Sequence, residues 1–253
     1  MRSIWARTFL AAALIPAGAC AGEKSDAPSP PRPRLTTPAS PSPRGFGNGG
    51  PCPRAEDPSL PPRAGCVTTA VMGDETLVVY ARLDREDEPR SWHLRLTGGP
   101  AIDQPLDAGN PYSYPYAVGS TDVDADGRPE WWVKVMDFTS HGAPWSSLNL
   151  FVERHGSLAA VSSKGEPLGV NVGGIARLGE GARCEDGRLV LLRAEARNPR
   201  NTRWTTSERS FTLRGSNAIL IGRSNGMLVI DDYNDPDLDP YYRITCEELR
   251  FGT

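Results

Sequence analysis

From residue 66 to the C-terminus, apolar positions come in short runs rich in Val, Leu, Trp and Tyr, separated by Gly, Pro, Asn and Asp. Such runs predict β-strands, because β-branched and aromatic side chains pack well on a half-buried sheet. No stretch has the 3.6-residue apolar repeat of an amphipathic helix, and residues 246–250 allow one helical turn at most. The predicted strands are 77–83, 92–96, 131–136, 148–152, 189–194, 211–213, 218–221 and 227–230. The pattern indicates an all-β, mostly antiparallel single domain, either partial propeller-like or a sandwich.

Short polar segments between these apolar runs predict turns. Asn225 and Gly226 separate the last two runs, and both residues tolerate the positive φ of a tight hairpin. Residues 154–157 and 186–187 are predicted as further turns on the same ground. The domain is therefore expected to be built largely from hairpins.

Residues 1–19 differ from the rest of the chain and predict an export signal. A start with two arginines is followed at 8–15 by an apolar stretch too short to span a bilayer. Small residues then lead into Cys20. The segment resembles the lipobox of bacterial lipoproteins, although Ala17 stands where that motif usually has Leu or Val. The resemblance implies a lipid such as palmitate on Cys20 and an extracytoplasmic protein anchored to the bacterial cell membrane.

An alternative reading of the same segment stays open. Ala17, Gly18 and Ala19 also form an A-x-A site at which an ordinary signal peptidase could cut. The protein would then be secreted, with Cys20 left as a thiol. The cysteine count favours lipidation, because the chain has five cysteines and a lipidated Cys20 leaves an even number for disulfides.

The remaining cysteines predict two disulfides in an oxidising compartment. They are Cys52, Cys66, Cys184 and Cys246. Four cysteines allow three pairings, and we favour the local one, Cys52 with Cys66 and Cys184 with Cys246. This pairing would staple the start of the domain and tie its last strand back.

Composition divides the chain into three parts. After the signal segment 1–19, residues 20–65 are rich in Pro, Ser, Gly and Arg and predict a disordered linker, whereas residues 66–253 are ample for one β-domain. The net charge of −3 argues against a nucleic-acid partner, which would need a cationic surface. No later segment is long and apolar enough to be a transmembrane helix.

One motif has the residue types and spacing to bind a metal ion, and it predicts a calcium site. Acidic residues alternate with others from position 122, Gly127 permits a sharp turn, and a further acid follows before a strand. Oxygen donors at this spacing can converge on a hard cation. The expected ligands are the side chains of Asp122, Asp124, Asp126 and Glu130 and the carbonyl oxygen of Arg128. An EF-hand is excluded because Val133, within a predicted strand, stands where its last ligand would be.

The motif resembles the calcium loop of FG-GAP and VCBS-type repeat proteins, in which D-x-D-x-D-G-x-x-D/E precedes a hydrophobic strand. The resemblance covers about residues 119–161, one blade-like unit. It implies a mainly structural Ca²⁺ and a surface or secreted protein. The chain departs from the family in having a single full loop, so a closed propeller is not expected. The alternative, a solvated Asx-rich turn, stays open, and the second acidic stretch, 231–240, is favoured as an exposed loop over a second ion site.

Other candidate features are weaker. The three histidines, His93, His141 and His155, have no zinc-site spacing, and neither G-x-S-x-G nor a P-loop occurs. The aromatic residues Tyr112, Tyr114 and Tyr116, and Phe138, His141 and Trp145, could stack on a sugar but are favoured as cover for the core. The arginine-rich stretch 188–223 is favoured as solvated surface, because alternation along a strand splays its charges onto both faces.

These features favour a lipid-anchored surface protein that acts as a calcium-stabilised binding or structural module. The alternative is a secreted hydrolase acting on cell-wall or glycan material, with residues 112–116 lining its site. No catalytic motif supports assignment as an enzyme. The expected partners are the membrane, through the N-terminal lipid, and a cell-wall, glycan or protein ligand.

Overall fold

The computed structural model describes residues 58–252, except 100, 109–113, 141–142, 176, 233–234 and 248. All of them belong to one unit of the chain, Asn48–Thr253. The predicted signal segment 1–19, the lipidation position Cys20 and most of the linker 20–65 lie outside the described residues. Among the residues described, no helix is both long and apolar enough to cross a membrane.

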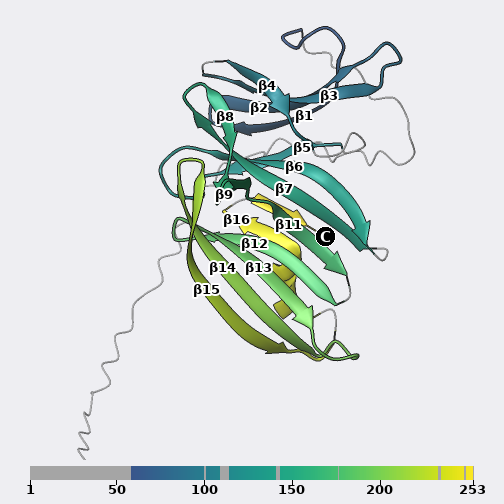
Figure 1. The fold of residues 1–253 in the computed structure, drawn as a ribbon, viewed down its shortest axis with the longest axis vertical. Coiled ribbons are helices and arrows are strands. Elements are labelled where there is room, and N and C mark those ends of the chain that lie inside the picture. Colours follow the sequence, from purple (N-terminus) through teal and green to yellow (C-terminus); the bar gives the residue numbers. More distant parts are fainter. Residues whose placement is uncertain are drawn as a thin grey trace, which may run out of the picture. The chain divides into compact units, whose positions relative to one another are not determined.

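The domain is all-β and mostly antiparallel, as the sequence predicts (Figure 1). A four-stranded sheet of sequential hairpins has the order β1–β2–β3–β4. Its strands are β1 (Ala64–Met72), β2 (Glu75–Leu83), β3 (Pro89–Thr97) and β4 (Ile102–Leu106). Leu60, which precedes β1, is already buried, so packing begins before residue 66.

A 13-stranded sheet holds the rest of the chain. Its first strands are β5 (Tyr116–Thr121), β6 (Glu130–Ser140), β7 (Ala143–Arg154), β8 (Ser157–Ala160), β9 (Ser162–Ser163), β10 (Glu166–Pro167) and β11 (Val170–Ile175). They are followed by β12 (Leu178–Glu185), β13 (Arg188–Ala196), β14 (Arg203–Arg214), β15 (Asn217–Val229), β16 (Arg243–Cys246) and β17 (Leu249–Gly252). Two pairings in it are parallel, β12 with β16 and β9 with β15. Because β8 pairs with β7 and leads into β9, it links the two sides of the sheet.

Strand β6 lies between two hydrophobic clusters, which explains the uninterrupted apolar run at 131–133. Trp131 and Val133 belong to the cluster that includes Leu94 of the small sheet, whereas Trp132 belongs to a second cluster with Leu150. Successive side chains on a strand point to opposite faces, so a strand buried on both faces reads as unbroken hydrophobic sequence. The small sheet therefore covers one face of the large sheet at β6.

The predicted strands are present, and two predicted turns are confirmed. His155 and Gly156, at φ 52° and 77°, connect β7 to β8. Asp186 and Gly187, at φ 50° and 68°, connect β12 to β13. Positive φ at both central residues is the geometry that suits the right-handed twist of paired strands.

The predicted turn at Asn225 and Gly226 is wrong. Both residues lie inside β15, opposite Ser207 and Thr206 of β14, and the segments 218–221 and 227–230 belong to one continuous stretch ending just past that strand. Gly226 serves close packing instead, because a Cβ atom there would lie 2.8 Å from Thr206 Oγ1. The turn that joins β14 to β15 lies earlier, where Gly215 has φ 64°.

The C-terminal segments also differ from expectation. In place of the helical turn allowed at 246–250, the described residues form the β16–β17 hairpin, in which Cys246 pairs with Leu249 and Glu247 has φ 50°. Part of the acidic stretch 231–240 forms a short 3₁₀ helix, η1 (Pro236–Tyr242), which Asp235 caps by accepting the N–H of Asp237. Leu238 is buried and packs this helix against the sheet. The sequence does not predict this packing, because acidic residues and prolines surround Leu238.

Two cysteines of the predicted framework are joined. Cys184 of β12 and Cys246 of β16 form a disulfide with a Cα–Cα distance of 4.6 Å. Cys66 is also disulfide-bonded, and its favoured partner, Cys52, lies outside the described residues. The C-terminal disulfide thus ties the last hairpin to the middle of the large sheet.

Candidate metal centre

The predicted calcium motif connects β5 to β6, and we call residues 122–130 the acidic loop. Its ends are held together, because Thr121 of β5 pairs with Glu130 of β6. The indole Nε1 of Trp132 donates to Thr121 Oγ1 at 2.9 Å, and both side chains are buried. Val123 packs into the same hydrophobic cluster as Trp132. The loop is thus anchored to the core at both ends.

Asp122 shapes the interior of the loop. Its Oδ1 accepts the N–H of Asp126 at 3.0 Å, and its Oδ2 accepts the N–H of Gly127 at 2.9 Å. Asp126 Oδ1 in turn accepts the N–H of Arg128 at 2.9 Å. Ala125 and Gly127, at φ 58° and 82°, reverse the chain between them. Side-chain caps of this kind let a loop turn sharply without leaving its amides unsatisfied.

The structure brings together three of the four predicted carboxylate ligands. Asp122, Asp124 and Glu130 each offer an oxygen within 4.8 Å of the others. Asp126 is exposed and lies outside this group, and its Oδ1 instead caps the N–H of Arg128. The Arg128 carbonyl oxygen stays a predicted ligand. Among the described residues, no other cluster of acidic, histidine or cysteine side chains is placed to hold a metal, and this includes the described part of 231–240.

The three carboxylates suit a hard cation of the size of Ca²⁺. Calcium–oxygen distances of about 2.3–2.6 Å place ligands on opposite sides of the ion about 5 Å apart, so a 4.8 Å cluster can surround it. Asp124 Oδ1 is buried and has no hydrogen-bond partner among the described residues. A buried carboxylate oxygen without a donor is costly, and a cation would satisfy it.

Electrostatics in the loop also favour a bound cation. Burial, reinforced by the three neighbouring aspartates, raises the pKa of Glu130 to about 8, against the hydrogen bond that Val123 N–H donates to it at 2.7 Å. Burial and then the charge of Asp126 raise the pKa of Asp124, and the nearby guanidinium of Arg154 opposes this. A divalent ion would lower both pKa values, because it stabilises the charged carboxylates.

One contact of the acidic loop was not predicted from the sequence. The β12–β13 turn packs against it, so that a Cβ atom on Gly187 would lie 3.2 Å from the carbonyl oxygen of Asp124. The turn was identified from its Asp-Gly pair, but nothing in the sequence indicates which loop it contacts. The acidic loop therefore braces β5 and β6 against β12 and β13.

The hydrolase alternative requires a nucleophile beside a base, and one such group exists on the small sheet. Ser91 Oγ lies 3.2 Å from His93 Nε2, and His93 Nδ1 lies 3.6 Å from Asp103 Oδ1. Burial and the charge of Arg82 lower the pKa of His93, which keeps the imidazole neutral. Both carboxylate oxygens of Asp103 accept from Tyr80 Oη, at 2.8 and 2.9 Å.

This arrangement is poor for catalysis. The contact between His93 and Asp103 is too long for the hydrogen bond that orients a catalytic base, and the carboxylate is engaged by Tyr80. His93 is buried and stacks on Tyr80 with ring centroids 5.2 Å apart. The geometry is that of a packed histidine on a sheet face.

The aromatic candidates for sugar recognition are mostly covered. Trp145 is buried, and Tyr116 carries the ammonium of Lys134 4.2 Å above its ring centroid. Tyr114 is exposed but contacts Trp92 edge-on at 6.0 Å. Tyr112, His141 and the side chain of Phe138 lie outside the described residues. The described aromatics therefore form no open stacking platform.

Comparisons with known proteins assign no family. No protein-family model matches the chain, and no curated protein does. A solved structure described as a Xanthomonas type IV secretion system related protein matches 68% of this chain and 98% of its own, at 18% identity and a TM-score of 0.29. At that TM-score the match carries no argument about function.

Proposed function

We propose that the chain is a lipid-anchored extracytoplasmic protein whose β-domain is a binding or structural module stabilised by Ca²⁺. The observation that carries the calcium part is the convergence of Asp122, Asp124 and Glu130 around the unsatisfied Asp124 Oδ1. Membrane attachment through Cys20 rests on the signal-like sequence before it. The disulfide between Cys184 and Cys246 supports an oxidising compartment.

The position of the acidic loop supports a structural role for the ion. Its ligands lie on β6 and on the connection from β5, and the β12–β13 turn abuts the same loop at Gly187. An ion bound there would lock two distant parts of the large sheet together. Because an ion bound only by the folded state stabilises it by mass action, the domain should melt higher in calcium.

Calcium titration of the purified full chain tests this proposal. We expect saturable binding by calorimetry and a higher unfolding temperature, both abolished by Asp124→Asn. Asp126→Asn, outside the three-carboxylate group, should weaken binding far less. Asp237→Asn removes a charge of the same sign from exposed η1 and should change nothing. An unchanged melting temperature in chelator and no binding heat would leave the loop as an acidic turn.

The anchor and the hydrolase alternative need separate tests. Cys20→Ser should move the protein from the detergent-rich to the aqueous phase and abolish incorporation of labelled palmitate. A secreted protein with an ordinary cleavage site would be aqueous in both forms. For catalysis, a fluorophosphonate probe should leave the chain unlabelled, and labelling that Ser91→Ala removes would instead favour the hydrolase.

A further inference from the structure

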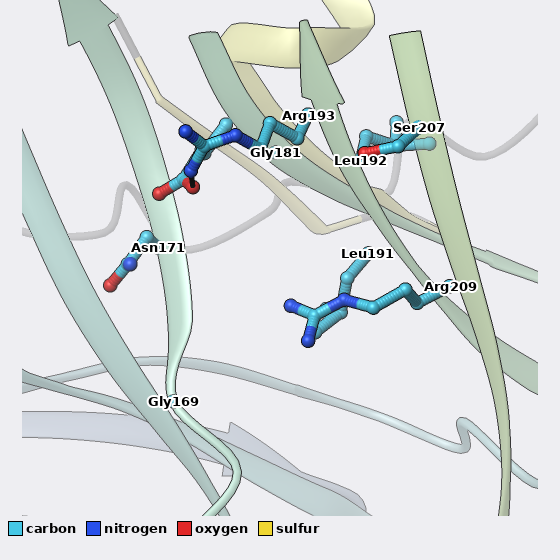
Figure 2. A pocket seen from close by; sticks show the side chains of 9 residues that line it. Gly169, Asn171, Gly181, Leu191, Leu192, Arg193, Ser207 and Arg209 are labelled. Carbon is cyan, nitrogen blue, oxygen red and sulfur yellow. Dashed lines mark hydrogen bonds and ion pairs between the residues drawn. The ribbon is translucent and has the colours of Figure 1, made fainter. Parts of the chain in front are cut away.

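A second polar site lies on the large sheet, away from the acidic loop. A hollow of about 250 Å³ is lined by residues of β11 to β14, including Asn171, Glu180, Leu191, Arg193, Ser207 and Arg209. Figure 2 shows the Arg193 and Arg209 side chains extending toward the strand that carries Asn171. The hollow thus combines the guanidinium groups of Arg193 and Arg209 with the Glu180 carboxylate, which pairs with Arg193. Asn171 and Ser207 add neutral hydrogen-bonding groups.

Strand register, not sequence proximity, assembles this site. Arg209 of β14 lies opposite Leu191 of β13 on one side and opposite Arg223 of β15 on the other. Residues directly opposite each other in an antiparallel pair share a face of the sheet. Arg193 shares that face, since it lies two residues from Leu191 on the same strand. We call Arg193, Arg209 and Arg223 the arginine face.

The charges on this face are not balanced within the described structure. Arg193 donates to Glu180 Oε1 at 2.8 Å, which neutralises one guanidinium. Arg209 and Arg223 form no ion pair with any described residue, although they are cross-strand neighbours. Like charges directly opposite each other destabilise a sheet. An anion between the two guanidinium groups would remove that repulsion.

We propose that the arginine face binds a small oxyanion, a phosphate or carboxylate group, between Arg209, which lines the hollow, and its cross-strand neighbour Arg223 on β15. The planar guanidinium fork matches the two oxygens of such a group. A hollow of about 250 Å³ suits a phosphate or one small carboxylated molecule. This binding activity is independent of the calcium site proposed above.

The test follows the arginine Nε–Hε NMR signals of the full chain during titration, in chelator and at constant ionic strength set with chloride. Inorganic phosphate and glucuronate are the two probes. We expect saturable shifts of the Arg209 and Arg223 signals with at least one of them. Response to phosphate alone assigns a phosphoryl ligand, response to glucuronate alone a carboxylated one, and response to both a general oxyanion site.

Matched variants separate the site from general attraction of anions. Arg209→Gln should weaken binding about tenfold or more, because a charge-assisted hydrogen bond contributes about 1.5–3 kcal/mol. Arg214→Gln removes the same charge from β14, on the opposite face, and should leave the affinity unchanged. Both side chains are exposed, so both variants should fold, as their melting temperatures will show. Equal weakening by both variants, or no saturable shift with either probe, would overturn the proposal.

Discussion

The acidic loop and the arginine face both gather like charges on the large sheet, but they do so by different means. In the acidic loop, backbone hydrogen bonds hold the carboxylates, and Glu130 is only 3% exposed. On the arginine face, strand register brings exposed side chains together, and among the three described arginines only Arg193 has an ion-pair partner, Glu180. Like charges repel strongly when they are desolvated and weakly when water surrounds them.

Because of this difference, ligand binding at the two sites should affect the stability of the domain to different extents. A cation at the acidic loop would relieve a buried repulsion and should therefore stabilise the domain substantially. An anion at the arginine face would relieve a solvated repulsion and should change stability little.

The largest effect should come from the core residue that anchors the acidic loop. Trp132→Ala removes a fully buried indole and its hydrogen bond to Thr121, and should destabilise the domain by about 3–5 kcal/mol in urea unfolding. It should also weaken calcium binding, because the end of the loop is released.

A second tryptophan provides the control. Trp204 is equally buried, but it packs in a cluster with Leu192 on the other face of the large sheet and donates to Asn201 O at 2.7 Å. Trp204→Ala should cost a similar free energy of unfolding and leave the calcium affinity of the folded protein unchanged. If both variants lose calcium affinity equally, the loop has no special coupling to Trp132.

The next effect concerns pH. Burial raises the pKa of Glu130 from its ordinary 4.5 to about 8 in the folded protein, so the folded state holds a proton that the unfolded state has lost between these values. In chelator, stability should therefore fall as pH rises from about 4.5 to 8, by roughly 2–4 kcal/mol. Urea unfolding across this range measures the slope.

Two controls test whether Glu130 causes the predicted pH dependence: saturating calcium and the variant Glu130→Gln. Saturating calcium should suppress the fall, because the ion binds the deprotonated carboxylate, and binding below pH 8 should release protons. Glu130→Gln cannot titrate and should flatten the profile in chelator. A profile in Glu130→Gln as steep as in the wild type would assign the pH dependence to other groups.

A smaller effect should come from the turn that braces the acidic loop. Gly187→Ala places a Cβ atom 3.2 Å from Asp124 O at φ 68°, and should cost about 1–2 kcal/mol and weaken calcium binding without removing a ligand. Gly156→Ala introduces strain at φ 77° where nothing lies within 4 Å. It should cost a similar free energy and leave calcium binding intact, and any loss of affinity in it would refute the contact's role.

The two sites also differ in how far the sequence predicts them. The acidic loop is local, so its residues could be named from their spacing. The spacing could not show that Asp126 caps Arg128 N–H while Asp122, Asp124 and Glu130 converge, because that depends on how the backbone turns.

The residues of the arginine face lie far apart in the sequence, and the prediction of a merely solvated surface did not bring them together. Alternation does splay the arginines of 188–223 onto both faces, yet Arg193, Arg209 and Arg223 still meet on one of them. Their meeting depends on the register of β13, β14 and β15. The predicted turn at Asn225 and Gly226 would divide β15 and leave Arg223 between two strands, so it conceals this neighbourhood. The short apolar runs were enough to predict an all-β architecture, whereas the pairing register of the strands could be read only from the structure.

The smallest effect should come from the arginine face itself. Arg223→Glu converts the like-charge pair with Arg209 into an opposite-charge pair and should stabilise the domain by about 0.2–1 kcal/mol at low salt. The gain should shrink as salt rises, because both side chains are exposed. The same variant should lose binding of phosphate or glucuronate, so that stability rises while affinity falls. Arg223→Gln, which removes repulsion without adding attraction, should lie between the two in stability. If Arg223→Glu instead destabilises the domain at every salt concentration, the two guanidinium groups do not repel in the folded protein, and the electrostatic reason for an anion at this face is lost.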